Sequence, residues 1–597
     1  MSGPQPSAKR IPAHWVWLAL AVIAALAYLF QLGGDHIPRN GDELVYAHIA
    51  RLTAESGHWL PLVSSYDFMR NTKPPMLFWQ AMVAGGWGEH WTLLRLRLPS
   101  VVYLWATALV VGLLTWKIVK GTQPLPGNIG NGSTTSNTHA VSMGAIAALV
   151  FLSFFSTYRY GRPYLTSAPE TFWLGSVFFA MAWSPAKLLA SRWKFPLLAG
   201  LAIGVGCLYK SFAMVAPVGL ALALCYQVLH ARRAPWQIIR PGILSDVFKT
   251  TIICVLALAV FSLWFVLDPL PGEVWREFVV GENAGKFKSG PSYLSLAFSG
   301  SGGIPVILTG YFVNAGLLFP LSVGAAWTAW RSYRARRHTD EKISDAEKVM
   351  WLWLLALAVV FMLPSQRSAR YLIPAMPAVA VLIALYWGRI SSVWFSLTLV
   401  FSILGALAMA SIGYGAVKAT QDAGVYSPLF WLLLALMVAG SLAGIFKKSW
   451  TQALTLPCSF AFLVAMAWVT APFNGPLGHF KSSTVARVQG QSVRVPNNFN
   501  GQFERYQFLL TGAKIGAYDA PQPVDYSDAD IDNLFKTSRY VLVQRRLGQP
   551  ACANCRVIDV RWDIRSRQDP REGTWAALKT PDTFWYSREY LVEKIQP

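Results

Sequence analysis

The feature that most constrains this chain is a series of long apolar runs, each close to the length that a lipid bilayer requires. A helix needs about 17–25 predominantly apolar residues to cross the hydrocarbon core. The runs lie near residues 14–32, 98–117, 139–157, 169–185, 195–209, 212–230, 249–267, 303–329, 349–364, 371–387, 391–412, 427–446 and 452–471. The sequence therefore predicts an α-helical polytopic membrane protein with about 13 transmembrane helices.

Composition and charge agree with a membrane protein. Only 14% of the residues are charged and 54% are hydrophobic, whereas about a quarter of a soluble protein is charged. The net charge of +22 would suit nucleic acid, but the basic residues cluster at the ends of apolar runs, as the positive-inside rule describes. We therefore expect membrane lipids, and no nucleic acid, as partners.

The charge pattern also predicts an orientation. Counted from a cytoplasmic N-terminus, every inward connection is basic, and the count places the C-terminus on the outer, periplasmic face. The first run could instead be a signal peptide, because Ala25-Leu26-Ala27 resembles a cleavage site. The run continues apolar through Tyr28-Leu29-Phe30, which favours an uncleaved first span. The expected location is the bacterial inner membrane.

The chain changes character after residue 471. Acidic and basic residues mix there, and short β-leaning runs occur at 505–510, 539–544, 556–562 and 590–594. We predict a transmembrane domain over 1–471 and a small soluble α/β domain over 472–597, exposed to the periplasm.

Two of the six cysteines, Cys552 and Cys555, form a Cys-x-x-Cys pair in the polar C-terminal region. A zinc site would need a second pair or a histidine cluster nearby, and neither is present in the sequence. A disulfide in an oxidising compartment is the preferred interpretation, and a redox-active pair is the alternative.

The loop over residues 33–96 is crowded with charged groups that a bilayer would reject. Asp42 and Glu43 open a predicted amphipathic helix with Val45 and Ile49 on its apolar face. Acidic residues in a first turn also complement the helix dipole, which is the simplest structural explanation of the pair.

A second helix is predicted to begin later in the same loop. Lys73 precedes Pro74-Pro75, and proline is well suited to a first helical turn. An acidic pair and a lysine, each at a helix start beside a membrane, could face a charged lipid headgroup.

Several basic residues lie at the ends of apolar runs that the predicted orientation places outside. They are Arg159, Arg162, Lys210, Lys286, Lys288, Arg367 and Arg370. Each could be an interfacial anchor whose charged end reaches water. As a set on one face they predict a cationic cavity that binds phosphate through charge-assisted hydrogen bonds.

The first loop resembles that of one group of membrane glycosyltransferases. The matching residues are Asp42-Glu43, Tyr46-Ala47, Ile49-Ala50, Gly57-x-Trp59 and Thr72-Lys73-Pro74-Pro75-Met76-x-Phe78-Trp79. They are similar to the first periplasmic loop of enzymes of the GT-C type, related to aminoarabinose transferases of lipid A and to protein O-mannosyltransferases. The resemblance implies a hexosyl- or pentosyltransferase with a polyprenyl-phosphate-linked sugar donor. The expected acceptor is lipid A, lipopolysaccharide or another envelope glycan.

The resemblance also assigns residues. It implies that Asp42, with Glu43 beside it, is catalytic. The donor phosphate is expected to contact the following side chains: Lys73, Lys210, Arg159, Arg162, Lys286 and Tyr371. No cofactor or metal is expected to be required, although scattered acidic residues could bind a divalent cation.

The chain departs from the pattern of this group at several positions. Val45 stands where an arginine is usual, Lys286 replaces an arginine, and Ser211 replaces a glycine. An expected aspartate is missing around Ser167 and Ala168. The identities of the sugar and of the acceptor are therefore not inferred from the known members of this group. A transporter or flippase of an anionic lipid-linked cargo is the alternative function, and a non-catalytic scaffold would leave the first loop unexplained.

Overall fold

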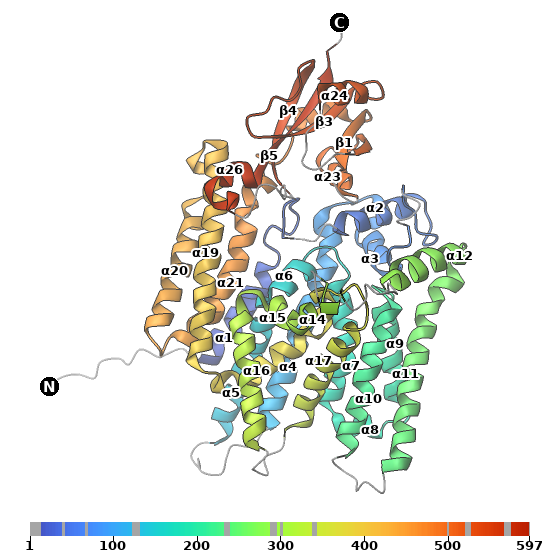
Figure 1. The fold of residues 1–597 in the computed structure, drawn as a ribbon, viewed down its shortest axis with the longest axis vertical. Helices are drawn as coiled ribbons and strands as arrows, with labels where there is room; N and C mark the ends of the chain where they lie inside the picture. Colours follow the sequence, from blue (N-terminus) through green and yellow to red (C-terminus); the bar gives the residue numbers. More distant parts are fainter. Residues whose placement is uncertain are drawn as a thin grey trace, which may run out of the picture.

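The structure is a computed structural model that describes residues 13–38, 42–65, 70–121, 132–231, 239–286, 295, 297–298, 302–336, 343–497, 501–519, 527–565 and 575–595. It consists of an elongated helical body with a small β-sheet at one end (Figure 1). That end is called the sheet end below.

Helices form most of the described chain. Up to residue 274 the helices are α1 (Ala13–Ala27), α2 (Asp42–Glu55), α3 (Met76–Ala84), α4 (Leu93–Gly121), α5 (Gly132–Ser153), α6 (Phe155–Gly161), α7 (Ser167–Trp183), α8 (Pro185–Ala190), α9 (Lys194–Cys207), α10 (Val215–Ala231), α11 (Ile239–Leu267) and α12 (Pro271–Val274). They are followed by the π-helix η5 (Trp275–Asn283), α14 (Ile304–Leu308), α15 (Gly310–Ala315), α16 (Phe319–Arg336), α17 (Asp345–Phe361), the 3-10 helix η8 (Ala369–Ala375), α18 (Met376–Tyr386), α19 (Ser392–Thr420), α20 (Pro428–Phe446) and α21 (Thr451–Val469).

The predicted fold class is confirmed, since a helix lies at each of the apolar runs named above. Among the described residues, eight helices are long and apolar enough to cross a membrane, or nine if the bent pair α5–α6 is one span. Helices α1 and α9 are apolar but shorter. The chain is thus a multi-pass membrane protein, and the exact number of spans stays a prediction.

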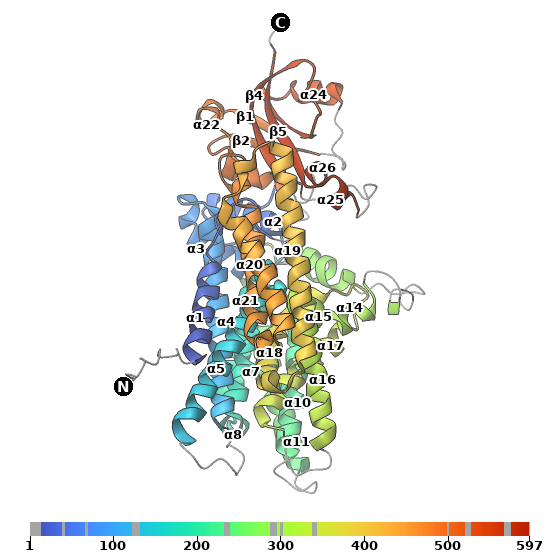
Figure 2. The same ribbon diagram turned by 90° about the vertical axis from the view of Figure 1, so that its left-hand side faces the viewer.

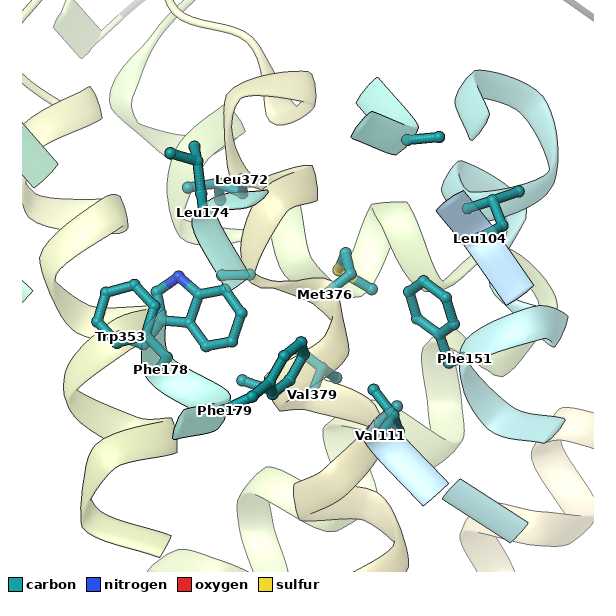
Figure 3. Close-up of a cluster of buried hydrophobic side chains, with 14 of the residues drawn as sticks. Leu104, Val111, Phe151, Leu174, Phe178, Phe179, Trp353, Leu372, Met376 and Val379 are labelled. Atoms are coloured by element: carbon teal, nitrogen blue, oxygen red, sulfur yellow. The ribbon is translucent and has the colours of Figure 1, made fainter. Parts of the chain in front are cut away.

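Helix α18 lies at the centre of the helical body. The span that contains it, Ala369–Arg389, is 83% buried, compared with 22–56% for the other long spans. Figure 3 shows its Met376 and Val379 among apolar side chains from α4, α5, α7 and α17. Phe178 and Trp353 stack with ring centroids 4.6 Å apart. Lipid tails are as apolar as these side chains, so close packing rather than hydrophobicity holds such helices together.

Helices α4 and α5 approach closely where glycines face each other. A Cβ atom on Gly144 would lie 2.6 Å from the carbonyl oxygen of Gly112, too close for any side chain. Small residues at such positions are a common device of membrane helix pairs. The pairing fixes the first long span against its neighbour.

The C-terminal region forms one mixed five-stranded sheet of order β2-β1-β3-β5-β4. Its strands are β1 (Ser492–Asn497), β2 (Lys514–Asp519), β3 (Tyr540–Arg546), β4 (Cys555–Ile564) and β5 (Tyr586–Lys594). Strand β1 pairs in parallel with β2 and β3, and β5 pairs antiparallel with β3 and β4. The predicted small α/β region is therefore present, and its exact boundary at residue 472 stays a prediction.

One predicted strand is wrong. Residues 505–510 include helix α23 (Arg505–Leu509) instead of a strand. Phe503, Tyr506 and Leu509 recur every three residues and are buried in the core of the sheet region, which is the spacing of one helix face. Strands β1 and β2, by contrast, were not predicted.

Cys552 and Cys555 form a disulfide bond in the structure. The pair lies just before and at the start of β4 and packs against the small cluster around Phe535 and Val543. This placement agrees with a structural bridge in the C-terminal region.

The C-terminal region contacts the helical body at several places, two of which involve α19 and α2. At the first, α26 (Pro581–Trp585) packs against the end of α19 (Figure 2), with Pro581 directly over Gly415. Tyr586 donates a hydrogen bond to the carbonyl oxygen of Ile412 at 2.9 Å. The sheet therefore cannot rotate freely above the helices.

At the second place, the C-terminal region holds helix α2, which lies between the helical body and the sheet (Figure 1). The fully buried carboxylate of Glu504 accepts a hydrogen bond from Arg51 Nε at 2.5 Å and lies 2.9 Å from His48 Nδ1. Ser65 N–H donates to the other ring nitrogen of His48, so the Nδ1 proton is the one that meets Glu504. Gly501, at φ +70°, lies against Val45, where a Cβ would be 3.0 Å from the Val45 Cα.

We predict that Glu504→Ala destabilises the protein strongly while Glu55→Ala does not. Both acids bind Arg51, but Glu504 is buried and Glu55 is 53% exposed. Removing one partner of a buried pair leaves an uncompensated charge and costs about 3–5 kcal/mol, whereas an exposed pair contributes about 0–1 kcal/mol. Thermal unfolding in detergent measures both variants, and equal melting shifts would contradict the assignment of Glu504 as the buried anchor.

Candidate active site

A cavity of about 870 Å³ opens in the helical body close to the sheet end. Its charged lining residues come from α2, the loop before α3, the α9–α10 connection, η5 with the turn after it, and η8. They are Asp42, Lys73, Lys210, Glu282, Lys286 and Arg370. Segments far apart in sequence thus bring four cations and two carboxylates to one cavity.

Asp42 is the first residue of α2 and lines this cavity. Arg370 from η8 donates a hydrogen bond to its Oδ2 at 3.2 Å, and both side chains are about one-third exposed. The guanidinium also lies over the Tyr160 ring at 5.0 Å. The carboxylate is therefore oriented by a cation while it stays open to the cavity.

Lys73 and Lys286 share a single carboxylate. Lys73 Nζ donates to Glu282 Oε1 at 2.8 Å, and Lys286 Nζ donates to the same oxygen at 3.2 Å. Lys73 also donates to the carbonyl oxygen of Thr72 at 2.7 Å. Two ammonium groups converge on one oxygen, which is the arrangement that an oxygen of a phosphate group would also satisfy.

The surroundings shift the pKa values of both Lys73 and Glu282. Burial lowers the pKa of Lys73 below its ordinary value, against the opposing effect of Glu282. For Glu282, burial acts to raise the pKa, but the two lysines outweigh it and the pKa is lowered. Glu282 is therefore ionised at neutral pH and competes with other anions for the lysines.

A third lysine, Lys210, lies in the connection that follows α9. It donates to Oε2 of Glu170, a fully buried residue of α7, at 2.7 Å. Ser211, next to it, donates to Asn283 Oδ1 at 2.7 Å and so links this connection to η5. The lysine is held at the cavity wall by a carboxylate beneath it.

Much of the remaining wall is apolar. Phe212, Met214, Val279, Phe361 and Leu363 line it together with other apolar residues. A cavity lined by both charged and apolar groups suits an amphipathic ligand, one end of which carries a negative charge.

Of the residues predicted from the sequence, five lie together in this cavity: Asp42, Lys73, Lys210, Lys286 and Tyr371. Of the outward bases that predicted a cationic cavity, Lys210, Lys286 and Arg370 line it, Arg159, Arg162 and Arg367 do not, and Lys288 lies outside the described residues. The roles of these residues stay predictions.

Glu43 does not line the cavity. It is fully buried and binds Arg97 through both carboxylate oxygens, at 2.6 and 2.9 Å, and it accepts a hydrogen bond from the Tyr164 N–H. Asp42 and Glu43 therefore have different surroundings, although they are neighbours on α2. The geometry gives Glu43 a structural role.

The two predicted arginines also lie outside the cavity. Arg162 is fully buried and donates to the Tyr28 carbonyl oxygen at 3.0 Å and to the Tyr158 hydroxyl at 2.8 Å. Arg159 lies over the rings of Phe155 and Tyr160. Arg162 thus joins α6 to the segment after α1, whereas Arg159 packs on rings of its own helix α6.

From the sequence, Arg370 had a role only as one of the outward bases, and Glu282 had none. Only the fold shows that Arg370 reaches Asp42. The available signal for Glu282 was its position four residues before Lys286, which is the spacing of a helical ion pair.

One group of described residues has the spacing of a metal site: Asp35, His36 and Asp563, with ligand atoms within 4.8 Å of one another. Arg505 already binds both carboxylates, at 2.7 and 2.5 Å. The group is better described as a buried ion-pair network at the sheet junction. That no cofactor is required stays a prediction.

The chain is similar in sequence to proteins of known name. No family model matches it. It is 26% identical over 377 residues to undecaprenyl phosphate-α-4-amino-4-deoxy-L-arabinose arabinosyl transferase 1 of Sodalis glossinidius, a match that spans 62% of this chain but only 59% of that protein. It is 22% identical over 487 residues to the transferase of the same name, without a number, from Serratia proteamaculans, which covers 77% of each chain.

Solved structures extend the likeness over the whole chain. ArnT from Cupriavidus metallidurans bound to undecaprenyl phosphate has a TM-score of 0.56 at 16% identity, covering 96% of this chain and 98% of that one. The same protein in the apo state has a TM-score of 0.54 at 15% identity, covering 97% and 98%. The resemblance to aminoarabinose transferases inferred from the first loop is confirmed: the chain is similar to them in sequence and shares the fold of the ArnT structures.

Proposed function

We propose that the chain is a membrane glycosyltransferase that moves a sugar from a polyprenyl phosphate to an acceptor. The observation that carries this proposal is the cavity in which Asp42 lies open beside three lysines and an apolar wall. Such a cavity suits a phosphate with a long isoprenoid chain. The curated relatives are named as undecaprenyl phosphate-dependent transferases, and one structural neighbour holds undecaprenyl phosphate.

In this reaction an acceptor oxygen forms a bond to the anomeric carbon while the bond from that carbon to the donor phosphate breaks. The polyprenyl phosphate leaves with the electron pair of that bond. Lys73 and Lys286 stabilise the negative charge that develops on it, and Lys210 adds a further cation at the wall. No covalent enzyme intermediate is needed, and inversion at the anomeric carbon follows.

The part of Asp42 depends on the acceptor. If the acceptor is a hydroxyl group, Asp42 takes its proton as general base. If the acceptor is a phosphate, as on lipid A, no proton has to be removed and Asp42 orients a partner such as Arg370. Lipid A, lipopolysaccharide or another envelope glycan is the acceptor that we propose, with the cavity and the sheet on the periplasmic side and the N-terminus in the cytoplasm.

We predict that Asp42→Asn lowers transfer a hundredfold or more if Asp42 is a general base, since such groups contribute about 10²–10⁴. Asparagine has nearly the same shape, so folding and donor binding should survive. The measurement is sugar transfer by purified protein whose melting is unchanged, together with binding of the lipid-linked donor. Near-normal transfer would refute the catalytic role. If binding of the lipid-linked donor is lost together with transfer, a transport function is favoured.

Lys73→Ala is predicted to weaken binding of undecaprenyl phosphate about ten- to hundredfold, because a hydrogen bond to a charged group contributes about 1.5–3 kcal/mol. Lys418→Ala is the matched control, since Lys418 binds Asp582 at the surface. Binding measured in detergent should fall in the first variant alone; equal losses would mean that the phosphate lies elsewhere.

Glu282→Gln is predicted to strengthen the same binding about two- to fivefold, since it removes a partly exposed carboxylate that holds both lysines. Glu273→Gln, which alters an acid that binds Arg70 beside the same loop, is the control. Weaker binding in Glu282→Gln would show that the carboxylate positions the lysines for phosphate rather than competing with it.

A further inference from the structure

A second cavity, of about 750 Å³, lies at the end of the helical body opposite the sheet. It is formed by the ends of α1, α4, α5, α16, α17, α18 and α21, and by the turn η9 (Trp387–Arg389). It shares no lining residue with the candidate active site. The proposed transferase reaction gives it no task.

Two arginines mark this cavity. Arg336 ends α16, and its Nη1 lies 4.0 Å from Oε2 of Glu347. Arg389 is exposed at the end of η9, with its guanidinium 4.8 Å from the centre of the Tyr386 ring. Within the described part of the chain, Arg389 makes no ion pair.

Among the described lining residues, the one carboxylate, that of Glu347, is already bound by other side chains. Glu347 is buried, and its Oε1 accepts hydrogen bonds from the Tyr386 hydroxyl and from Trp351 Nε1. Its other oxygen lies 4.0 Å from Arg336 Nη1, and Arg389 remains as an additional positive charge on the same wall.

Neutral donors complete the polar lining. Ser344 accepts a hydrogen bond from the Glu347 N–H, which leaves its own hydroxyl proton available. The amide of Gln452 and the ring of His139 also lie in the wall. Guanidinium groups with hydroxyl and amide donors are the chemistry that binds a phosphate group.

The surroundings indicate that the phosphate belongs to a lipid. Trp17 and Trp387 line the cavity with ring centroids 6.2 Å apart, and tryptophan is enriched where a membrane meets water. On the same helix as Trp17, the apolar side chains of Trp15 and Leu18 are 57% and 39% exposed. A surface for acyl chains thus lies beside the cavity for a headgroup.

We propose that this cavity binds the phosphate headgroup of an anionic phospholipid, in the leaflet opposite the candidate active site. Arg336 and Arg389 bind the phosphate oxygens, and the acyl chains lie along α1. Basic pockets between helices on the cytoplasmic side commonly hold such headgroups. If Arg336 and Arg389 served only to set the orientation of the protein in the membrane, the cavity would not bind one kind of lipid in preference to others.

Native mass spectrometry of the purified protein with phosphatidylglycerol or phosphatidylcholine tests the proposal. One phosphatidylglycerol should bind in preference to phosphatidylcholine. Arg336→Gln and Arg389→Gln should each weaken that binding about fivefold, the effect of one basic residue near a lipid headgroup. Arg389→Lys should retain most of it. Lipid that stays bound when Arg336 and Arg389 are both replaced by Gln belongs to other sites, such as the candidate active site.

Arg334→Gln is the matched control, because Arg334 lies on the same turn of α16, exposed, over the Trp330 ring and outside the cavity. An equal loss in this variant, or no preference for phosphatidylglycerol, would overturn the proposal. Melting of each variant in phosphatidylcholine alone separates lost binding from misfolding. If inorganic phosphate competes with phosphatidylglycerol at equal affinity, the lipid assignment is wrong and the ligand is a soluble phosphate.

Discussion

The structure depends first on a buried ion pair between Glu43 and Arg97. Arg97, fully buried, binds both oxygens of Glu43 and donates to the carbonyl oxygens of Leu32 and Gly34. Glu43 also accepts from the N–H of Tyr164. One pair therefore ties the end of the first helix segment, the start of α2, helix α4 and the connection before α7. A buried pair is costly to form and still costlier to break, which makes it suited to fixing a geometry.

That geometry determines where Asp42 points. Glu43 faces the helical body, so the preceding residue, rotated by about 100° on the helix, faces the cavity. From the other side, Glu504 of the C-terminal region binds His48 and Arg51 one and two turns further along α2. The helix that presents Asp42 is thus held by the helical body below and by the sheet region above. The small C-terminal sheet is therefore part of the support of the site rather than a separate attachment.

Much of this could be predicted because it is encoded locally. Apolar runs of bilayer length gave the helices, and the motif around Asp42 and Lys73 indicated the cavity. What failed depends on the third dimension or on short segments. Strand β1 has the proline Pro496 near its end and β2 the glycine Gly516, so neither has the usual composition of a strand. Glu504 meets α2 from the far end of the chain, and no local pattern announces such a contact.

At two departures from the aminoarabinose transferase pattern, another part of this chain supplies a charged group nearby. Val45 leaves no arginine one turn after Asp42, but Arg370 from η8 brings a guanidinium to the same carboxylate. The aspartate missing around Ser167 is matched by Glu170, one turn further along α7, which binds Lys210 and lies on the same helix face. In this chain the charges beside Asp42 and Lys210 thus come from η8 and α7. Coulomb interactions depend on distance and sign, not on which segment supplies the charge. Val45 itself lines the cavity and Gly501 packs against it, so the C-terminal region reaches the cavity wall beside Asp42.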